Sequence, residues 1–128
     1  MTPDAAQRDR IFRAFGRAFF KQDLDAMYEV VTPDFTWTLL ANGTLRMLDT
    51  REKVAAFFVE RKTQVENVRF ADVVYHHAPD ASFMTFRMTG TDKATGQPFA
   101  SVGVERYTFR DGRLAVKDVY VRPADASG

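Results

Sequence analysis

Apolar residues occur at helical spacing in the first half of the chain and in alternating runs in the second half. Spacings of three and four residues predict a first helix that begins at a Thr2 cap and carries the apolar stripe Ile11, Phe12, Phe15 and Phe19. Asp23 is a typical cap for a short second helix, and a third helix is expected over residues 49–63. Between these two helices, residues 35–40 alternate in the way that a strand does.

Four long segments rich in β-branched and aromatic residues follow the third helix, over residues 66–77, 82–92, 99–109 and 114–121. Helices first and hairpin-connected strands afterwards are typical of an α+β fold, in which helices pack on one face of a mostly antiparallel sheet. Gly90 and Gly103 favour a strongly curved sheet. We therefore expect one domain over residues 1–128, with a frayed tail at residues 124–128.

The last two segments form the clearest hairpin, because Asp111-Gly112 suits the two-residue type I′ turn. Continued pairing from that turn predicts the composition of both faces of the hairpin. One face would carry Gly103, Glu105, Tyr107, Phe109, Leu114, Val116, Asp118 and Tyr120, with Glu105 directly opposite Asp118. The other face would carry an apolar patch made of Val102, Val104, Val119 and Val121.

Composition and charge exclude several classes of function. The chain of 128 residues has no cysteine, so neither a disulfide nor thiol chemistry is expected. A net charge of +1 gives no field that would attract nucleic acid or a membrane surface. No apolar run approaches the ~20 residues of a membrane span, and the polar N-terminus lacks a signal-peptide pattern, so a cytoplasmic protein is expected. His76 and His77 are the two histidines and would point to opposite faces of a strand, so we expect no metal site and no cofactor.

The predicted pair of carboxylates is the main candidate for chemistry. Two carboxyl groups side by side in a partly buried site cannot both ionise cheaply, so one pKa should rise. Such a pair could remove a proton next to a carbonyl and donate a hydrogen bond to the developing oxyanion. Arg87 on the neighbouring strand would instead hold both groups charged if it shares their face. The alternative is an ordinary acid pair on an exposed sheet face, balanced by basic residues.

Three motifs together resemble the nuclear transport factor 2-like superfamily, which includes ketosteroid isomerases and SnoaL-like polyketide cyclases. They are residues 21–27 leading into Thr32-Pro-Asp-Phe-Thr-Trp37, the helix opening at Asp49-Thr-Arg-Glu, and residues 103–114, and the resemblance covers residues 11–123. It implies a cone-shaped α+β fold whose helices close over a deep, mostly apolar pocket. It also implies a homodimer through the outer face of the sheet.

The resemblance matches the functional residues of these families only in part. Leu39 and Phe15 stand where ketosteroid isomerases carry the general-base Asp and the oxyanion-donating Tyr, and Glu105 stands about where they carry a second acid. Arg87 and Asp118 could supply two members of the Asp-Arg-Asp set of limonene epoxide hydrolase-like proteins. The arrangement of SnoaL-like cyclases, with an acid on the last strand and a polar partner on the strand before it, fits Asp118 and Glu105 best.

Two functions from different classes follow as expectations. The first is a cofactor-free isomerase, cyclase or hydratase-like enzyme for an apolar carbonyl compound, with Asp118 as the base, Glu105 as the acid or oxyanion partner and Arg87 orienting both. The second is a non-catalytic module of the same fold that binds a small apolar ligand or a partner protein. In either case the candidate pocket residues, which could equally be core, are Phe15, Phe19, Tyr28, Trp37, Leu39, Phe57, Phe58, Tyr107, Val116 and Tyr120.

Overall fold

A computed structural model describes residues 2–41 and 43–124 of the chain. The elements in order are α1 (Ala5–Lys21), α2 (Leu24–Glu29), β1 (Val31–Ala41), β2 (Thr44–Leu48), α3 (Arg51–Gln64), β3 (Val65–His77), β4 (Ser82–Asp92), β5 (Pro98–Arg110) and β6 (Arg113–Pro123). The α+β class is therefore confirmed. Of the predicted frayed tail, residues 125–128 lie outside the described part, whereas the Ala124 amide donates to the Ala100 carbonyl.

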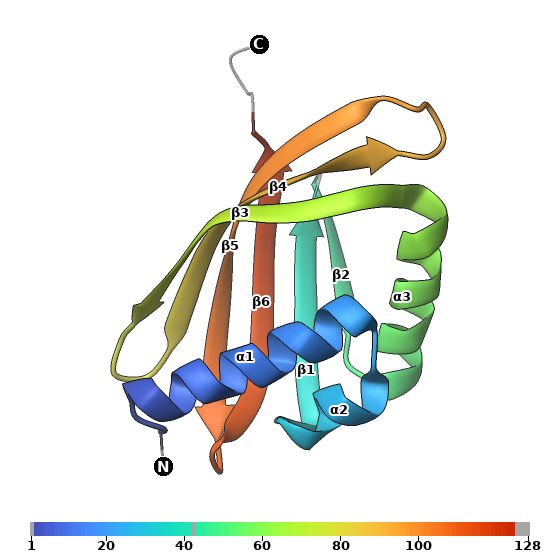
Figure 1. Cartoon of the computed structure of the whole chain (residues 1–128). Coiled ribbons are helices and arrows are strands. Elements are labelled where there is room, and N and C mark those ends of the chain that lie inside the picture. The colour runs from blue at the N-terminus through green and yellow to red at the C-terminus, as the bar shows by residue number, and fades with distance from the viewer. Residues whose placement is uncertain (1, 42, 125–128) are drawn as a thin grey trace.

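The strands form one sheet in the order β2-β1-β6-β5-β4-β3, and all neighbours are antiparallel except β1 and β6. The sheet curves, and α1 and α3 lie against its concave face (Figure 1). We call this the inner face and the opposite one the outer face. None of the helices in the described residues is long and apolar enough to cross a membrane.

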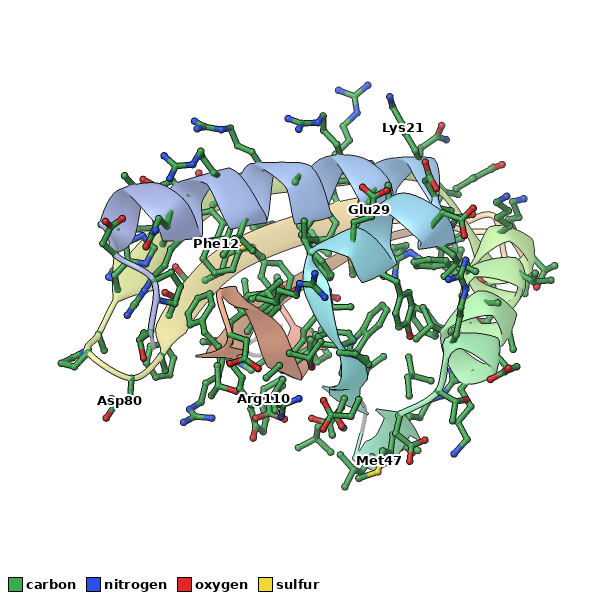
Figure 2. The ribbon with its side chains drawn as sticks, turned by 90° about the horizontal axis from the view of Figure 1, so that it is seen from below. Phe12, Lys21, Glu29, Met47, Asp80 and Arg110 are labelled. Carbon is green, nitrogen blue, oxygen red and sulfur yellow. The ribbon has the colours of Figure 1, made fainter. Side chains whose placement is uncertain are left out.

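The helix starts follow their capping residues. The α1 helix begins at Ala5 rather than near Thr2, because Asp4 and Gln7 exchange hydrogen bonds in a capping box that Thr2 cannot form. Asp23 caps α2 as predicted. Phe12 points from α1 towards the sheet and Lys21 points away from it (Figure 2), so the apolar stripe of α1 meets the inner face.

A β-bulge in the β5–β6 hairpin changes the predicted register. The turn itself is as expected, with positive φ at Asp111 and Gly112 and with Phe109 opposite Leu114. The next pair is Thr108 with Val116, so Ala115 is an extra residue on β6. Strand side chains alternate between the two faces, so one extra residue places every later β6 side chain on the face opposite to the one predicted.

The predicted pairing of Glu105 with Asp118 is therefore wrong. Glu105 lies opposite Val119, and Asp118 lies opposite Arg106. Glu105 and Tyr107 stay on the inner face, while Asp118 takes the outer face. The same shift changes the predicted apolar patch on the outer face. Val119 and Val121 were predicted to belong to it, but they border a cavity on the inner side of the sheet.

Gly103 lies where the curved sheet leaves no room for a side chain. A Cβ built there would be 2.5 Å from the Phe86 ring and 2.8 Å from the Tyr120 carbonyl oxygen. Gly16 in α1 is the matched control, because a Cβ there meets no atom within 4 Å.

Gly103→Ala is expected to lower the free energy of unfolding by about 1–3 kcal/mol through overpacking. Gly16→Ala should instead raise it by up to about 1 kcal/mol, because alanine favours helix. Urea denaturation of both variants measures the difference. Equal stabilities would contradict the close packing at Gly103.

Candidate functional site

Two cavities lie between the helices and the inner face of the sheet. The smaller, of about 130 Å³, is bordered by residues of α1, β3, β4, β5 and β6 and is called the α1 cavity. The larger, of about 310 Å³, extends towards α3 and is called the α3 cavity. The side chains that border both are Phe19, Phe70, Glu105 and Lys117. A carboxylate and an ammonium therefore lie where two mostly apolar cavities meet.

A buried polar cluster of Glu105, Tyr107 and Lys117 occupies this junction. Glu105 and Tyr107 alternate inward on β5, and Lys117 is the cross-strand partner of Tyr107 on β6. Glu105 exposes 5% of its surface and Lys117 exposes 3%. Lys117 Nζ lies 3.8 Å from Glu105 Oε1, and the Tyr107 hydroxyl donates a hydrogen bond to the same oxygen. The bulge at Ala115 is what turns Lys117 inward to meet this carboxylate.

Three aromatic rings surround the Lys117 ammonium. Its Nζ lies 4.2 Å from the ring centroid of Trp37, 4.5 Å from that of Phe19 and 5.0 Å from that of Phe15. Aromatic faces attract cations and do so most strongly when water is excluded. They also replace little of the hydration that the ammonium has lost. The Glu105 carboxylate is the ammonium's nearest anion.

Burial decides the ionisation behaviour of the groups around Glu105. It lowers the pKa of Lys117, and the attraction of Glu105 partly opposes this shift. It raises the pKa of Tyr107 well above its usual value of 10.0, and the charge of Glu105 adds to the rise, so the phenol keeps its proton. It also raises the pKa of Tyr75, which borders the α1 cavity, to about 12. Glu105 therefore accepts a hydrogen bond from a phenol that keeps its proton and lies beside the Lys117 ammonium.

The cluster combines a proton acceptor with a positive charge, and both side chains are almost fully buried. A carboxylate can take a proton from a bound molecule, and a neighbouring ammonium stabilises negative charge that develops on it. Trp37 borders the α3 cavity, and its indole N–H is buried without a hydrogen-bond partner. In the described part of the chain, no three His, Asp or Glu side chains are placed to hold a metal ion.

The other two predicted catalytic residues lie away from Glu105. Asp118 is on the outer face, where it accepts a hydrogen bond from Thr38 Oγ1 and lies 3.8 Å from Arg106. Arg87 is exposed on β4, also on the outer face, opposite Val102. The predicted acid pair is thus not formed, and Arg87 does not share the face of Glu105. The roles predicted for Asp118 and Arg87 in catalysis stay predictions.

Six of the ten predicted pocket residues border a cavity: Phe15, Phe19, Trp37, Leu39, Phe57 and Tyr107. The other four do not border the α1 or the α3 cavity. Phe58 packs in the core, and Tyr28 lies against the guanidinium of Arg51. Val116 and Tyr120 were placed inward by the register without the bulge, and they face outward in the structure.

The main residues that the prediction missed are Lys117, Arg61 and Phe70, which border the α3 cavity. Lys117 alternates with Val119 and Val121, and a basic residue in an apolar alternation is the signal that could have marked it. Arg61 is in the last turn of α3, where basic residues are usual, so its sequence position carries no such signal.

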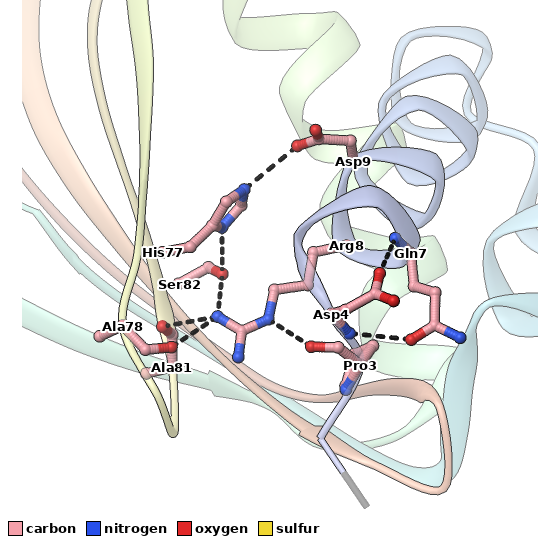
Figure 3. Close-up of polar contacts among 9 residues, drawn as sticks. All are labelled: Pro3, Asp4, Gln7, Arg8, Asp9, His77, Ala78, Ala81 and Ser82. Carbon is pink, nitrogen blue, oxygen red and sulfur yellow. Dashed lines mark hydrogen bonds and ion pairs between the residues drawn. The ribbon is translucent and has the colours of Figure 1, made fainter.

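At one end of α1, the His77 ring contacts Ser82 through one nitrogen and Asp9 through the other. His77 Nδ1 lies 2.7 Å from Ser82 Oγ, and His77 Nε2 lies 3.1 Å from Asp9 Oδ1 (Figure 3). Ser82 is fully buried, and Arg8 Nη1 donates a hydrogen bond to its hydroxyl. The three residues border neither cavity, and Arg8 also donates to the carbonyls of Ala78, Pro79 and Ala81. These contacts attach α1 to the β3–β4 turn.

Solved structures with low sequence identity share this fold. A nuclear transport factor 2-like protein from Burkholderia xenovorans has a TM-score of 0.79 at 17% identity, covering 92% of this chain and 91% of its own. A candidate SnoaL-like polyketide cyclase from Jannaschia sp. has a TM-score of 0.75 at 19% identity, with coverages of 94% and 89%. A protein from Catenulispora acidiphila with a ketosteroid isomerase-like fold, solved with trimethylamine, has a TM-score of 0.70 at 18% identity, with coverages of 94% and 86%.

The sequence itself identifies the family. No curated protein matches the chain. The model of the SnoaL-like domain matches residues 12–117, which include most of α1, the whole of β1–β5 and the first part of β6 with Lys117. The inner-face cluster and both cavities thus lie almost wholly inside the matched segment. The chain has the nuclear transport factor 2-like fold and belongs to the SnoaL-like domain family.

Proposed function

We propose that this protein binds a small apolar carbonyl compound and catalyses isomerase- or cyclase-type proton transfer on it, with Glu105 as the proton acceptor. The observation that carries the proposal is a buried carboxylate at the meeting point of two mostly apolar cavities. Ligand pockets typically combine such apolar walls with a few convergent polar groups. The family and the structural neighbours support the same class of reaction, without naming a substrate.

The reaction would begin when Glu105 takes a proton from the carbon next to the carbonyl. The electrons of the broken C–H bond form a carbon–carbon double bond, and the carbonyl π electrons move to oxygen. The Lys117 ammonium stabilises the resulting oxyanion, and the Tyr107 hydroxyl holds Glu105 in position. Where the enolate is conjugated with a further double bond, return of the proton from Glu105 to the far carbon completes an isomerisation. Alternatively, attack of the enolate carbon on a second carbonyl of the same molecule closes a ring, and the alkoxide that forms takes the proton back from Glu105.

Binding without reaction is the second candidate function. The contacts of Glu105 favour it, because its carboxylate is already engaged by the Lys117 ammonium and by the Tyr107 hydroxyl. Exchange of α-hydrogens with solvent separates the two candidates. With 1-indanone or a two-ring ketone in D₂O, an enzyme accelerates deuterium uptake, which mass spectrometry measures. A binding module raises the melting temperature with the ketone but leaves its exchange rate unchanged.

The outer face of the sheet supports a further part of this proposal, a homodimer. Leu45, Met47 and Tyr120 are 65%, 52% and 48% exposed there. A shallow hollow beside Tyr120 is bordered by Leu40, Val102, Val104, Val121 and Arg122. Met47 points away from the helices (Figure 2). An exposed apolar patch of this kind, on a face that also carries charged side chains, can pair with its own copy about a two-fold axis, which is the commonest arrangement of soluble oligomers.

Tyr120→Glu combined with Met47→Glu is expected to convert a dimer to a monomer at micromolar concentration, because both changes put negative charge into the proposed interface at positions that are not cross-strand partners. Val59→Glu is the control, since Val59 is exposed on α3, which lies on the other side of the sheet. Sedimentation velocity measures the mass. A wild-type protein that sediments as a monomer at tens of micromolar would refute the dimer.

A further inference from the structure

We propose that the ligand of the α3 cavity is an apolar acid and that the Arg61 guanidinium binds its carboxylate. This inference rests on the proposed function for its cavity and adds the charge of the ligand. An apolar acid is here a compound with one carboxylate and an aromatic or aliphatic body.

The guanidinium of Arg61 lacks an anionic partner in the described part of the chain. Its one hydrogen bond runs from Nη2 to the Met88 sulfur, at 3.4 Å, and its Cζ lies 5.9 Å from the centre of the Phe19 ring. A guanidinium has five N–H donors, and a thioether is a weak acceptor. Arg61 is nevertheless partly buried, which lowers its pKa, and the attraction of Glu105, with which it forms no ion pair, only partly opposes this shift. Partly buried charges in proteins are usually paired.

Arg46 is the contrasting case in the same cavity. Its guanidinium donates to both carboxylate oxygens of Glu60, at 3.3 Å and 3.0 Å. This two-point geometry is the one that arginine favours with carboxylates. Arg61 borders the cavity with no such carboxylate, so the cavity leaves room for one to arrive with a ligand.

The charges that line the α3 cavity do not cancel. Glu60 balances Arg46 and Glu105 balances Lys117, which leaves the positive charge of Arg61. A ligand carboxylate would neutralise it in a partly enclosed and mostly apolar site. The unpaired indole N–H of Trp37 is a second donor on a residue of the same cavity. Charge and hydrogen-bond donors therefore both favour an anion over a neutral or cationic ligand.

The other residues that line the two cavities indicate the chemistry of the part of the ligand that does not meet Arg61. Leu39, Phe57, Phe86, Met88 and Val119 make the α3 cavity apolar, and Phe12, Phe20 and Met84 do the same for the adjoining α1 cavity. A fully polar anion such as inorganic phosphate would gain nothing from these surfaces. An aromatic or aliphatic acid can bury its body against them while its carboxylate meets Arg61.

Titration calorimetry with 2-naphthoate and 2-naphthamide tests the inference, because the two compounds share shape and differ in charge. The wild-type protein at neutral pH should bind the acid about tenfold or more tightly than the amide, as expected for a hydrogen bond to a charged group. Arg61→Met and Arg61→Gln should each remove this preference and leave the amide affinity nearly unchanged. Arg17→Met, on the exposed side of α1, should keep the preference.

Each outcome of this experiment decides the question. Equal affinities in the wild type would overturn the anion site and leave the proposed carbonyl pocket standing. A preference for the acid that survives both Arg61 variants would show that another residue supplies the charge, and this too would overturn it. Failure of both compounds to bind contradicts the inference, while ketone-dependent exchange continues to test the proposed function separately. Circular dichroism confirms that each variant is folded.

Discussion

Lys117→Met is expected to lower the free energy of unfolding by about 3–5 kcal/mol, as is typical when one partner of a buried ion pair is removed. Methionine fills much of the volume of the lysine side chain, so the loss comes from the charge left behind rather than from a void. That charge belongs to Glu105, which keeps the Tyr107 hydrogen bond but loses its ammonium. Urea denaturation at neutral pH measures the loss.

A double variant separates the ion pair from general damage to the core. Lys117→Met with Glu105→Gln removes both charges, so most of the lost stability should return, whereas two independent defects would add. Glu105→Gln alone leaves Lys117 with aromatic rings as its nearest partners and should also be destabilising. A Lys117→Met protein within about 1 kcal/mol of the wild type would contradict a buried, charged pair.

Glu105→Gln should also slow catalysed deuterium uptake by a ketone substrate by about 10²–10⁴-fold, the usual contribution of a general base. Glutamine keeps the shape of the side chain but cannot accept a proton at neutral pH. Its amide oxygen can still accept the Tyr107 hydrogen bond, so the cavity walls stay in place. Ligand-dependent stabilisation should therefore persist while exchange is lost. Comparable exchange rates in variant and wild type would show that another group removes the proton.

Much of the fold could be predicted from local patterns. The Asp111-Gly112 turn, the α1 stripe and the Asp23 cap are each determined by residues close in sequence, and all are present in the structure. The hairpin pattern also identified Glu105 and Tyr107 as residues of one face. These features required no knowledge of which strand lies beyond the hairpin.

The bulge at Ala115 could not be predicted in this way, because it depends on β1. The Leu114 amide donates to the Val30 carbonyl, and the β1–β6 ladder is irregular between Val31 and Thr36, in the region where the β5–β6 register shifts. The two ladders meet on β6, so the place of its extra residue coincides with contacts to a strand that is far away in sequence. Asp118 was misplaced for this reason, and Lys117 was missed for the same one.

Deuterium uptake by an apolar ketone, measured side by side in Glu105→Gln and Asp118→Asn, most directly tests whether the inner-face cluster is the site of chemistry. The structure places Glu105 at the cavity junction and Asp118 on the outer face with Thr38 and Arg106. We expect Glu105→Gln to lose the catalysed exchange and Asp118→Asn to retain it. Loss of exchange in Asp118→Asn, with full exchange in Glu105→Gln, would contradict the central claim.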